Sequence, residues 1–325
     1  MNSAKELRRL IESCELQHPM FKEQFEFLSQ RIEDALGGFS SRIEWVVGPS
    51  RVGKSMLINA LSRKYPETKV NGQRHVPVLA VKILSDVSPK LLPIFVLTAL
   101  GVSLNTRGQS TGAIFNRMLE QLRLAGTRVI LFEEASHLVE SGARVPVRGA
   151  GDWCKSLADS TNMTLLLFGV PRLERLLDSN EQLRLRASAR REFRPYDIRN
   201  QAEQMGFVAC VRTYSDLFKD CGWPINLPMQ TLVTQCYLLT GGLIGVLSRF
   251  MQELASQMAY ESPRILTLRD CQSAAESIES AGHPDFPAFF KDDVSPVELT
   301  AAHAYVLETN GMSIRRIVTK SEAVI

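Results

Sequence analysis

The order of hydrophobic and polar positions divides the chain near residue 200. Before that point, short apolar runs that predict buried strands alternate with segments whose apolar residues recur at helical spacing. Such alternation favours a parallel α/β sheet covered by helices. The runs that predict strands are 43–47, 76–81, 128–132 and 164–168, and Pro77 suits an edge position for the second of them. The predicted helices are 20–36, 55–62, 91–100 and 112–125, and the Gly-, Arg- and Pro-containing stretch 140–152 predicts a loop.

After residue 200 the pattern is helical throughout. Segments with helical spacing are separated by Gly222-Trp223-Pro224, Gly241-Gly242 and Ser262-Pro263, which predict a second, all-helical unit. The residues after 280 contain three prolines, and we expect a tail with one short helix at 297–307. The predicted domains are a helical segment at 1–40, an α/β unit at 41–199, a helical unit at 200–281 and a tail at 282–325.

Composition narrows the class of protein only slightly. The chain has 325 residues, is 45% hydrophobic and carries a formal net charge of +3, which permits a nucleic-acid partner without demanding one. Its six cysteines are scattered and form no CxxC or Cys/His ligand cluster, so we expect reduced thiols. The start of the chain has no signal-peptide pattern, and no run reaches the ~18 apolar residues of a membrane span. We therefore expect a cytoplasmic protein with no membrane partner.

The segment Gly48–Ser55 matches the phosphate-loop pattern GxxxxGK[ST], with a predicted strand before it and a helix after it. Its glycines let the backbone curl so that successive N–H groups point at phosphates, and the helix start adds further donors. We expect Lys54 to reach the β- and γ-phosphates of ATP and the Ser55 hydroxyl to bind Mg²⁺. The predicted nucleotide-binding residues are Gly48, Pro49, Ser50, Arg51, Val52, Gly53, Lys54, Ser55 and Met56.

A second acidic element follows the strand at 128–132, where four apolar residues end in Glu133 and Glu134. This is the form expected of a Walker B strand, in which the first acid supports Mg²⁺ and the second polarises the attacking water. Glu133 stands where Asp is usual, so we expect slow hydrolysis. The alternative is that both acids only provide a polar, solvent-exposed end to the strand and have no catalytic role. We expect His137 to be structural or part of an interface, because no second ligand residue accompanies it.

An arginine-rich segment follows the strand at 164–168. In an oligomeric ATPase such a segment often presents an arginine to the γ-phosphate bound by the neighbouring subunit. Arg186 and Arg190 are the candidates for this catalytic role, and spacing does not choose between them. A solvated basic face or a contact with DNA phosphates explains the pattern equally well. The five arginines are Arg184, Arg186, Arg190, Arg191 and Arg194.

In the helical unit, Thr240–Gly245 opens a helix that we expect to lie over the nucleotide. The positions where related lids carry a γ-phosphate-sensing arginine hold Leu243 and Ile244, and the nearest arginine is Arg249. We therefore expect weak or absent sensing from this lid.

These features, taken in order, resemble the TniB/TnsC family of AAA+ transposition regulators from Tn-seven-like mobile elements. The resemblance covers roughly residues 15–280. It implies an AAA+ P-loop fold with a five-stranded parallel sheet and a C-terminal helical lid. It also implies ATP-dependent assembly, as a ring or filament, on double-stranded DNA, and a link between a target-selection protein and transposase subunits, in an element that could be CRISPR-associated. The segments that carry it are His18-Pro19, Gly48–Ser55, Val129–His137, Leu165–Pro171, Gly241–Gly245 and Arg264–Thr267.

In such assemblies, DNA contacts come from loops that face the central channel. With no helix-turn-helix or stacking pattern, we expect contacts to phosphates that do not depend on DNA sequence. Ordinary solvated loops are the alternative. The candidate residues are Arg107, Ser110, Thr111, Arg144 and Arg148.

Two other functions stay open at this stage: a stand-alone P-loop NTPase or kinase that acts on a small molecule, and a scaffold that binds ATP without hydrolysing it. The stretch Phe286–Phe290 in the expected tail is apolar. Two alternatives are open for it: it docks on a partner such as a transposase subunit, or it packs on its own lid.

Overall fold

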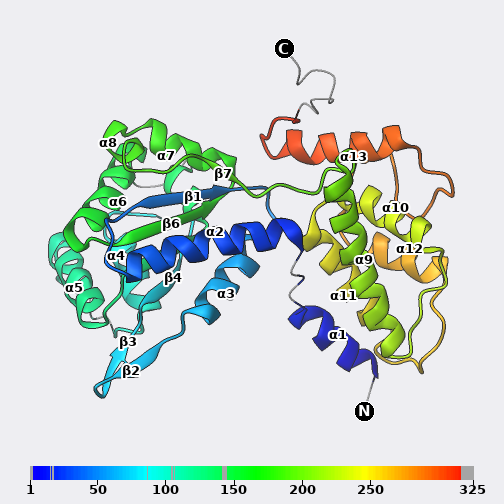
Figure 1. Cartoon of the computed structure of the whole chain (residues 1–325), viewed down its shortest axis with the longest axis horizontal. Coiled ribbons are helices and arrows are strands. Elements are labelled where there is room, and N and C mark those ends of the chain that lie inside the picture. The colour runs from blue at the N-terminus through cyan, green and yellow to red at the C-terminus, as the bar shows by residue number, and fades with distance from the viewer. Residues whose placement is uncertain are drawn as a thin grey trace. The chain divides into compact units, whose positions relative to one another are not determined.

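The computed structural model describes residues 3–14, 16, 18–85, 87–103, 105, 107–140 and 145–315. It forms two compact units, drawn in Figure 1. The sheet unit contains Glu23–Gly48 and Lys54–Phe193. The helical unit contains the described residues of 1–22, the short segment Pro49–Gly53, and the described residues from Arg194 onward.

The sheet unit is built on five parallel strands, as expected. Strand β1 lies inside the sheet between β6 and β7, and β4 lies at the edge, which confirms the position expected from Pro77. Every residue of β1 and β6 is buried, which explains why nearly all of them are apolar; the buried acid in β1 is Glu44, which pairs with Arg31 at 3.2 Å. In sheet order the strands are β4 (Val78–Lys82), β5 (Val129–Glu133), β6 (Thr164–Gly169), β1 (Ile43–Val47) and β7 (Arg191–Glu192).

The helices of the sheet unit confirm the helices predicted before residue 125. After residue 125, one predicted loop is wrong. The loop expected at 140–152 is wrong in its second half, because α6 begins at Val147 directly after Pro146. Its buried residues Ala150, Cys154 and Leu157 recur at helical spacing, but Gly149 and Gly151 hid this pattern. A small hairpin of β2 (Thr68–Val70) and β3 (Gln73–His75) was not predicted. The helices are α2 (Pro19–Leu36), α3 (Lys54–Lys64), α4 (Leu91–Ala99), α5 (Thr111–Leu124), η1 (Ala135–Val139), α6 (Val147–Thr161), η2 (Pro171–Leu173), α7 (Glu174–Asp178) and α8 (Glu181–Arg184).

The helical unit packs its helices around buried aromatic side chains, among them Tyr196, Phe207 and Tyr237. The N-terminal helix α1 belongs to this unit and packs against α11 and α9. The helices are α1 (Ser3–Ser13), α9 (Gln201–Asp220), α10 (Met229–Thr240), α11 (Ile244–Gln257), α12 (Leu268–Glu276) and α13 (Pro296–Thr309).

The segment expected to be a tail is packed into the helical unit as far as residue 315. Helix α13 packs on α10, and its start is fixed by a capping box in which Ser295 and Glu298 satisfy each other's backbone N–H groups. Phe289 is buried and stacks on Phe250, with ring centroids 5.1 Å apart. Of the two alternatives for Phe286–Phe290, packing within its own unit is therefore the one observed for Phe289.

A sharp turn separates α10 from α11. Gly241 and Gly242 have φ angles of +56° and +92° there, and a Cβ on Gly242 would come within 2.2 Å of the Tyr196 carbonyl oxygen. Among the described residues, no single helix is long and apolar enough to cross a membrane, although α10 and α11 pass that test as a pair bent by 115°.

Candidate nucleotide-binding site

The sheet topology brings the phosphate-loop ends and the two acids to the same edge. In a parallel sheet all strands end at one edge, where ligands of α/β proteins bind. Gly48 follows β1, and Glu133 ends β5. Only β6 lies between these two strands, so their ends are about 10 Å apart from strand spacing alone. The Gly48 N–H donates to the Gly169 carbonyl oxygen at the end of β6 over 3.1 Å, which fixes this edge.

Lys54 is the first residue of α3, and its side chain is buried. Its Nζ donates to the carbonyl oxygen of Gly48 over 2.8 Å, so the ammonium group lies against the start of the phosphate loop. Burial lowers the pKa of Lys54 to about 8, against the opposing effect of the Glu134 and Glu133 carboxylates. The ammonium attracts an anion such as a phosphate, whereas the two carboxylates repel it unless a cation such as Mg²⁺ lies between them and that anion.

Ser55 and Glu133, the two predicted Mg²⁺ ligands, are in direct contact. The Ser55 hydroxyl donates to the Glu133 carboxylate across 78 positions of sequence. Among the described residues, no three His, Cys, Asp or Glu side chains gather as a metal site. A hydroxyl and one carboxylate nevertheless suit Mg²⁺, which prefers oxygen ligands and usually takes the rest from phosphates and water. The donor set therefore fits Mg²⁺ bound together with a nucleotide.

Glu134 has an unusual backbone conformation that redirects its side chain. Successive residues of a strand point to opposite faces, which would separate the two acids. Glu134 instead adopts φ +56° and ψ +36°, the left-handed region, between β5 and η1. Both carboxylates consequently act on Lys54. A non-glycine residue held there costs about 1–3 kcal/mol, and such strain is typical of functional positions.

The turn after Glu134 is held to the end of β6. The Val170 N–H donates to the Ser136 hydroxyl over 2.7 Å. A Cβ on Gly169 would come within 2.3 Å of that hydroxyl oxygen, so Gly169 permits the close approach. His137 bonds through Nδ1 to the Ile83 carbonyl oxygen at 2.7 Å, which matches the structural role expected of it. Sequence reasoning missed Ser136, because nothing in its local pattern marks it.

The tip of the phosphate loop, Pro49–Gly53, belongs to the same compact unit as the C-terminal helices. Arg51 and Gly53 have φ angles of +63° and +114°, so the backbone curls as the motif requires. Val52 is buried, and Ser50 and Arg51 are exposed. The Arg51 carbonyl oxygen accepts a hydrogen bond of 2.9 Å from the N–H of Gly245 in α11. That contact was not predicted, because no local sequence pattern marks a backbone contact between residues this far apart.

The arginines of the segment 184–194 lie in separate environments. Arg186 pairs with Asp159 at 3.1 Å, and Arg190 pairs with Glu174 at 2.8 Å and Glu192 at 3.1 Å. The others also differ from one another: Arg184 is exposed, Arg191 lies over the Phe27 ring, and Arg194 is buried and donates to the Ser313 carbonyl oxygen.

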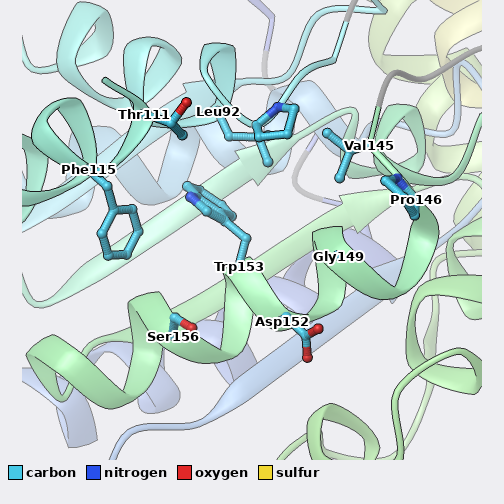
Figure 2. A pocket seen from close by; sticks show the side chains of 11 residues that line it. Leu92, Thr111, Phe115, Val145, Pro146, Gly149, Asp152, Trp153 and Ser156 are labelled. Carbon is cyan, nitrogen blue, oxygen red and sulfur yellow. The ribbon is translucent and has the colours of Figure 1, made fainter. Parts of the chain in front are cut away.

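The candidate DNA residues are only partly brought together. Arg107 and Arg148 are exposed, and Arg144 lies outside the described residues. Thr111 begins α5, after Ser110, whose side chain accepts from the Ala113 N–H. Thr111 and the start of α6 line one cavity of about 440 Å³. In Figure 2, Trp153 and Phe115 project into this space from α6 and α5. Its lining is mainly apolar and contains no phosphate-loop residue, so we do not regard it as the nucleotide site.

His18 is a buried member of the helical unit. Its Nδ1 lies 2.5 Å from the Tyr196 hydroxyl, and burial lowers its pKa to about 4. The ring is therefore neutral at pH 7 and joins the N-terminal segment to the segment that leads into α9.

The α/β sheet with its phosphate loop and the helical unit give this chain the P-loop fold of the AAA+ class, and comparisons with solved structures agree on that fold. ORC2 of Aeropyrum pernix, solved as ADPNP-ADP complexes, superposes with a TM-score of 0.63 at 13% identity, over 85% of this chain and 73% of that one. ORC1 of the same organism in complex with DNA gives 0.58 at 15%, over 84% and 69%. Cdc6p of Pyrobaculum aerophilum gives 0.56 at 10%, over 83% and 70%. At these identities the likeness establishes the fold alone.

A family model matches part of the sequence. Residues 37–194 match the model of the family described as "Bacterial TniB protein". A comparison with curated proteins finds no match.

Proposed function

We propose that this protein is an ATP-dependent regulator of DNA transposition that assembles on double-stranded DNA and links target selection to the transposase. The observation that carries the proposal is the convergence of Lys54, Ser55, Glu133 and Glu134 at one edge of the sheet. The match of residues 37–194 to the TniB family model supports the role in transposition.

Each residue of the edge has a distinct role in this proposal. The amides between Gly48 and Ser55 and the Lys54 ammonium bind the phosphates of ATP. Ser55 and Glu133 hold Mg²⁺, which neutralises phosphate charge when bound. Glu134 orients the attacking water and accepts its proton. Glu133 is already bonded to Ser55 and is longer than the usual Asp, which supports slow turnover.

Arg186, rather than Arg190, suits catalysis on a neighbouring copy. Ile43 at the start of β1 bridges to Ala187, so Arg186 lies at the amino edge of the sheet. The phosphate loop begins at the other end of this strand, about 13 Å away at the usual rise per residue. Arg186 therefore serves another subunit's nucleotide. Its partner Asp159 lines a cavity of about 500 Å³ together with Arg123 and Arg128, which gives this edge further positive charge.

DNA binding is proposed through phosphate contacts of Arg107, Thr111 and Arg148. The exposed positions of these residues support contacts that do not read sequence. Two similar structures, ORC1 of Aeropyrum pernix and Drosophila ORC, were solved with DNA. Such binding weakens steeply with salt, because counterions are released from the phosphates.

The test is electron microscopy of the full chain with a non-hydrolysable ATP analogue and duplex DNA, with nucleotide affinity measured in parallel. We expect rings or filaments only when both ligands are present. Lys54→Ala should abolish ATP binding and assembly, whereas Lys64→Ala, which removes a surface lysine of the same helix paired with Glu33, should change neither. Unchanged ATP affinity in Lys54→Ala would refute the site. Tight ATP binding by a particle that stays monomeric on DNA would favour a stand-alone NTPase.

A further inference from the structure

The amino end of α11 and the tip of the phosphate loop are packed together in one compact unit. Gly245 is the second residue of α11, and its N–H donates to the Arg51 carbonyl oxygen over 2.9 Å. The N–H groups in the first turn of a helix have no acceptor within the helix. The residue before α11, Leu243, supplies no side-chain cap. The phosphate loop therefore supplies an acceptor that the start of this helix lacks.

The reason for glycine at 245 is space and not backbone conformation. Its φ lies outside the left-handed range, and glycine inside a helix is less favourable than alanine. A Cβ at this position would lie 2.3 Å from the Arg51 oxygen and 3.0 Å from its carbonyl carbon. Both are backbone atoms, which cannot rotate aside as a flexible side chain does. Any side chain at 245 must consequently displace either the loop or the helix.

The contact acts on a part of the loop that is itself strained. Arg51 has φ +63°, a conformation that costs a non-glycine residue energy unless its surroundings hold it. The hydrogen bond from Gly245 fixes the orientation of the peptide plane that follows Arg51. That plane carries the N–H of Val52, one of the amides expected to face the phosphates.

We propose that Gly245 is a positioning residue for the phosphate loop. Its N–H and its missing side chain hold the Arg51 peptide in the conformation that receives phosphate, so the backbone of α11 takes the place of a sensing side chain in this lid. The proposal rests on the proposed ATP site at Gly48–Ser55. It makes the start of α11 and the loaded loop one ordered element.

The first test compares Gly245→Ala with Gly149→Ala. Both glycines lie in the first turn of a helix, but a Cβ on Gly149 meets only Val145 and Pro146 side-chain atoms, at 3.6 Å and 3.9 Å. We expect Gly245→Ala to weaken binding of a fluorescent ATP analogue at least tenfold while its melting temperature without nucleotide stays near that of the wild type. Gly149→Ala should bind within twofold of the wild type. Binding within twofold by folded Gly245→Ala would overturn the proposal.

The second test needs neither a variant nor ATP. Residue-resolved hydrogen exchange of the nucleotide-free wild type should show the Gly245 amide at least tenfold more protected than the first-turn amide of Gly149, after correction for intrinsic rates. Equal protection overturns the inference even if ATP binds. Strong protection in a protein that binds no ATP removes the proposed function and, with it, the positioning role, but leaves the contact established.

Discussion

The carboxyl edge of the sheet brings together residues that are far apart in the sequence. The arginine-rich segment 184–194 does the opposite, because residues close in sequence have different partners in space. At the edge, Ser55 and Glu133 are separated by 78 positions and share a hydrogen bond. In the arginine-rich segment, Arg186 and Arg190 are four positions apart and bind different acids, Asp159 and Glu174.

The difference follows from what holds each region. The edge residues are attached to strands whose register is fixed by hydrogen bonds along β1, β6 and β5. A residue directly after such a strand therefore lies close to the ends of the neighbouring strands. Arg186 and Arg190 lie in the irregular connection between α8 and β7, where each pairs with a different nearby carboxylate. A cluster of charged residues in the sequence therefore forms a site only where helices or strands bring the side chains together.

The largest effect should come from Glu134→Gln, which keeps the shape of the edge and removes the base. We expect ATP hydrolysis to fall by about 10³-fold, within the range for loss of general-base catalysis, while ATP affinity stays within about threefold. Phosphate release under saturating ATP measures the first, and a fluorescent ATP analogue the second. Glu140→Gln, which removes a carboxylate paired with Arg172, is the matched control. A wild type that binds ATP but releases no phosphate would instead establish the scaffold alternative.

Arg186→Ala should lower hydrolysis by about 10²-fold under conditions in which the protein assembles on DNA. The effect is smaller than that of some trans-acting arginines, because Arg186 must first leave Asp159. The decisive feature is concentration dependence: dilute, unassembled protein should hydrolyse ATP at the same slow rate with or without this arginine. Exposed Arg184 provides the neighbouring control in Arg184→Ala. An equal loss in the unassembled protein would mean that Arg186 acts on its own subunit, contrary to its place at the amino edge.

Arg190→Ala should act on stability and leave catalysis unchanged. Its guanidinium bridges Glu174 and Glu192 and is less than one-third exposed. We expect the free energy of unfolding to fall by about 1 kcal/mol, the upper value for partly exposed pairs. Chemical denaturation measures this, and Arg186→Ala should change it by less than about 0.5 kcal/mol, since Arg186 is more exposed than Arg190 and pairs with one acid instead of two. A stable Arg190→Ala with impaired hydrolysis would return Arg190 to the catalytic candidates.

The same contrast explains which parts of the site the sequence reveals. The apolar runs before Gly48 and Glu133 predicted both strands, and parallel pairing then brought their ends together. The left-handed backbone of Glu134 was not predictable, because local propensity gives glutamate no reason to adopt it. Nor was the role of Gly245, whose neighbour Arg51 lies nearly two hundred positions earlier. The start of α6 was missed because Gly149 and Gly151 mimic a loop, and the partners of the arginines depend on packing that no local pattern records.

The smallest expected effect is a pH dependence of ATP affinity, and it tests whether Lys54 has the buried character that the edge gives it. Burial disfavours the ammonium form and lowers the pKa of Lys54 to about 8, whereas a bound triphosphate favours that form and raises the pKa again. Binding above pH 8 therefore takes up a proton, so affinity should be constant below pH 7 and fall as pH rises. Between pH 7.0 and 8.5 we expect about a fourfold loss, from the fraction of Lys54 left protonated in the free protein. Isothermal titration across this range measures it. Lys54→Arg is the control, because a guanidinium stays charged throughout and any affinity that remains should be flat with pH. An ATP affinity that does not change with pH in the wild type would show that Lys54 has an ordinary pKa. The surroundings of Lys54, including Gly48, Glu133 and Glu134, would then not lower its pKa.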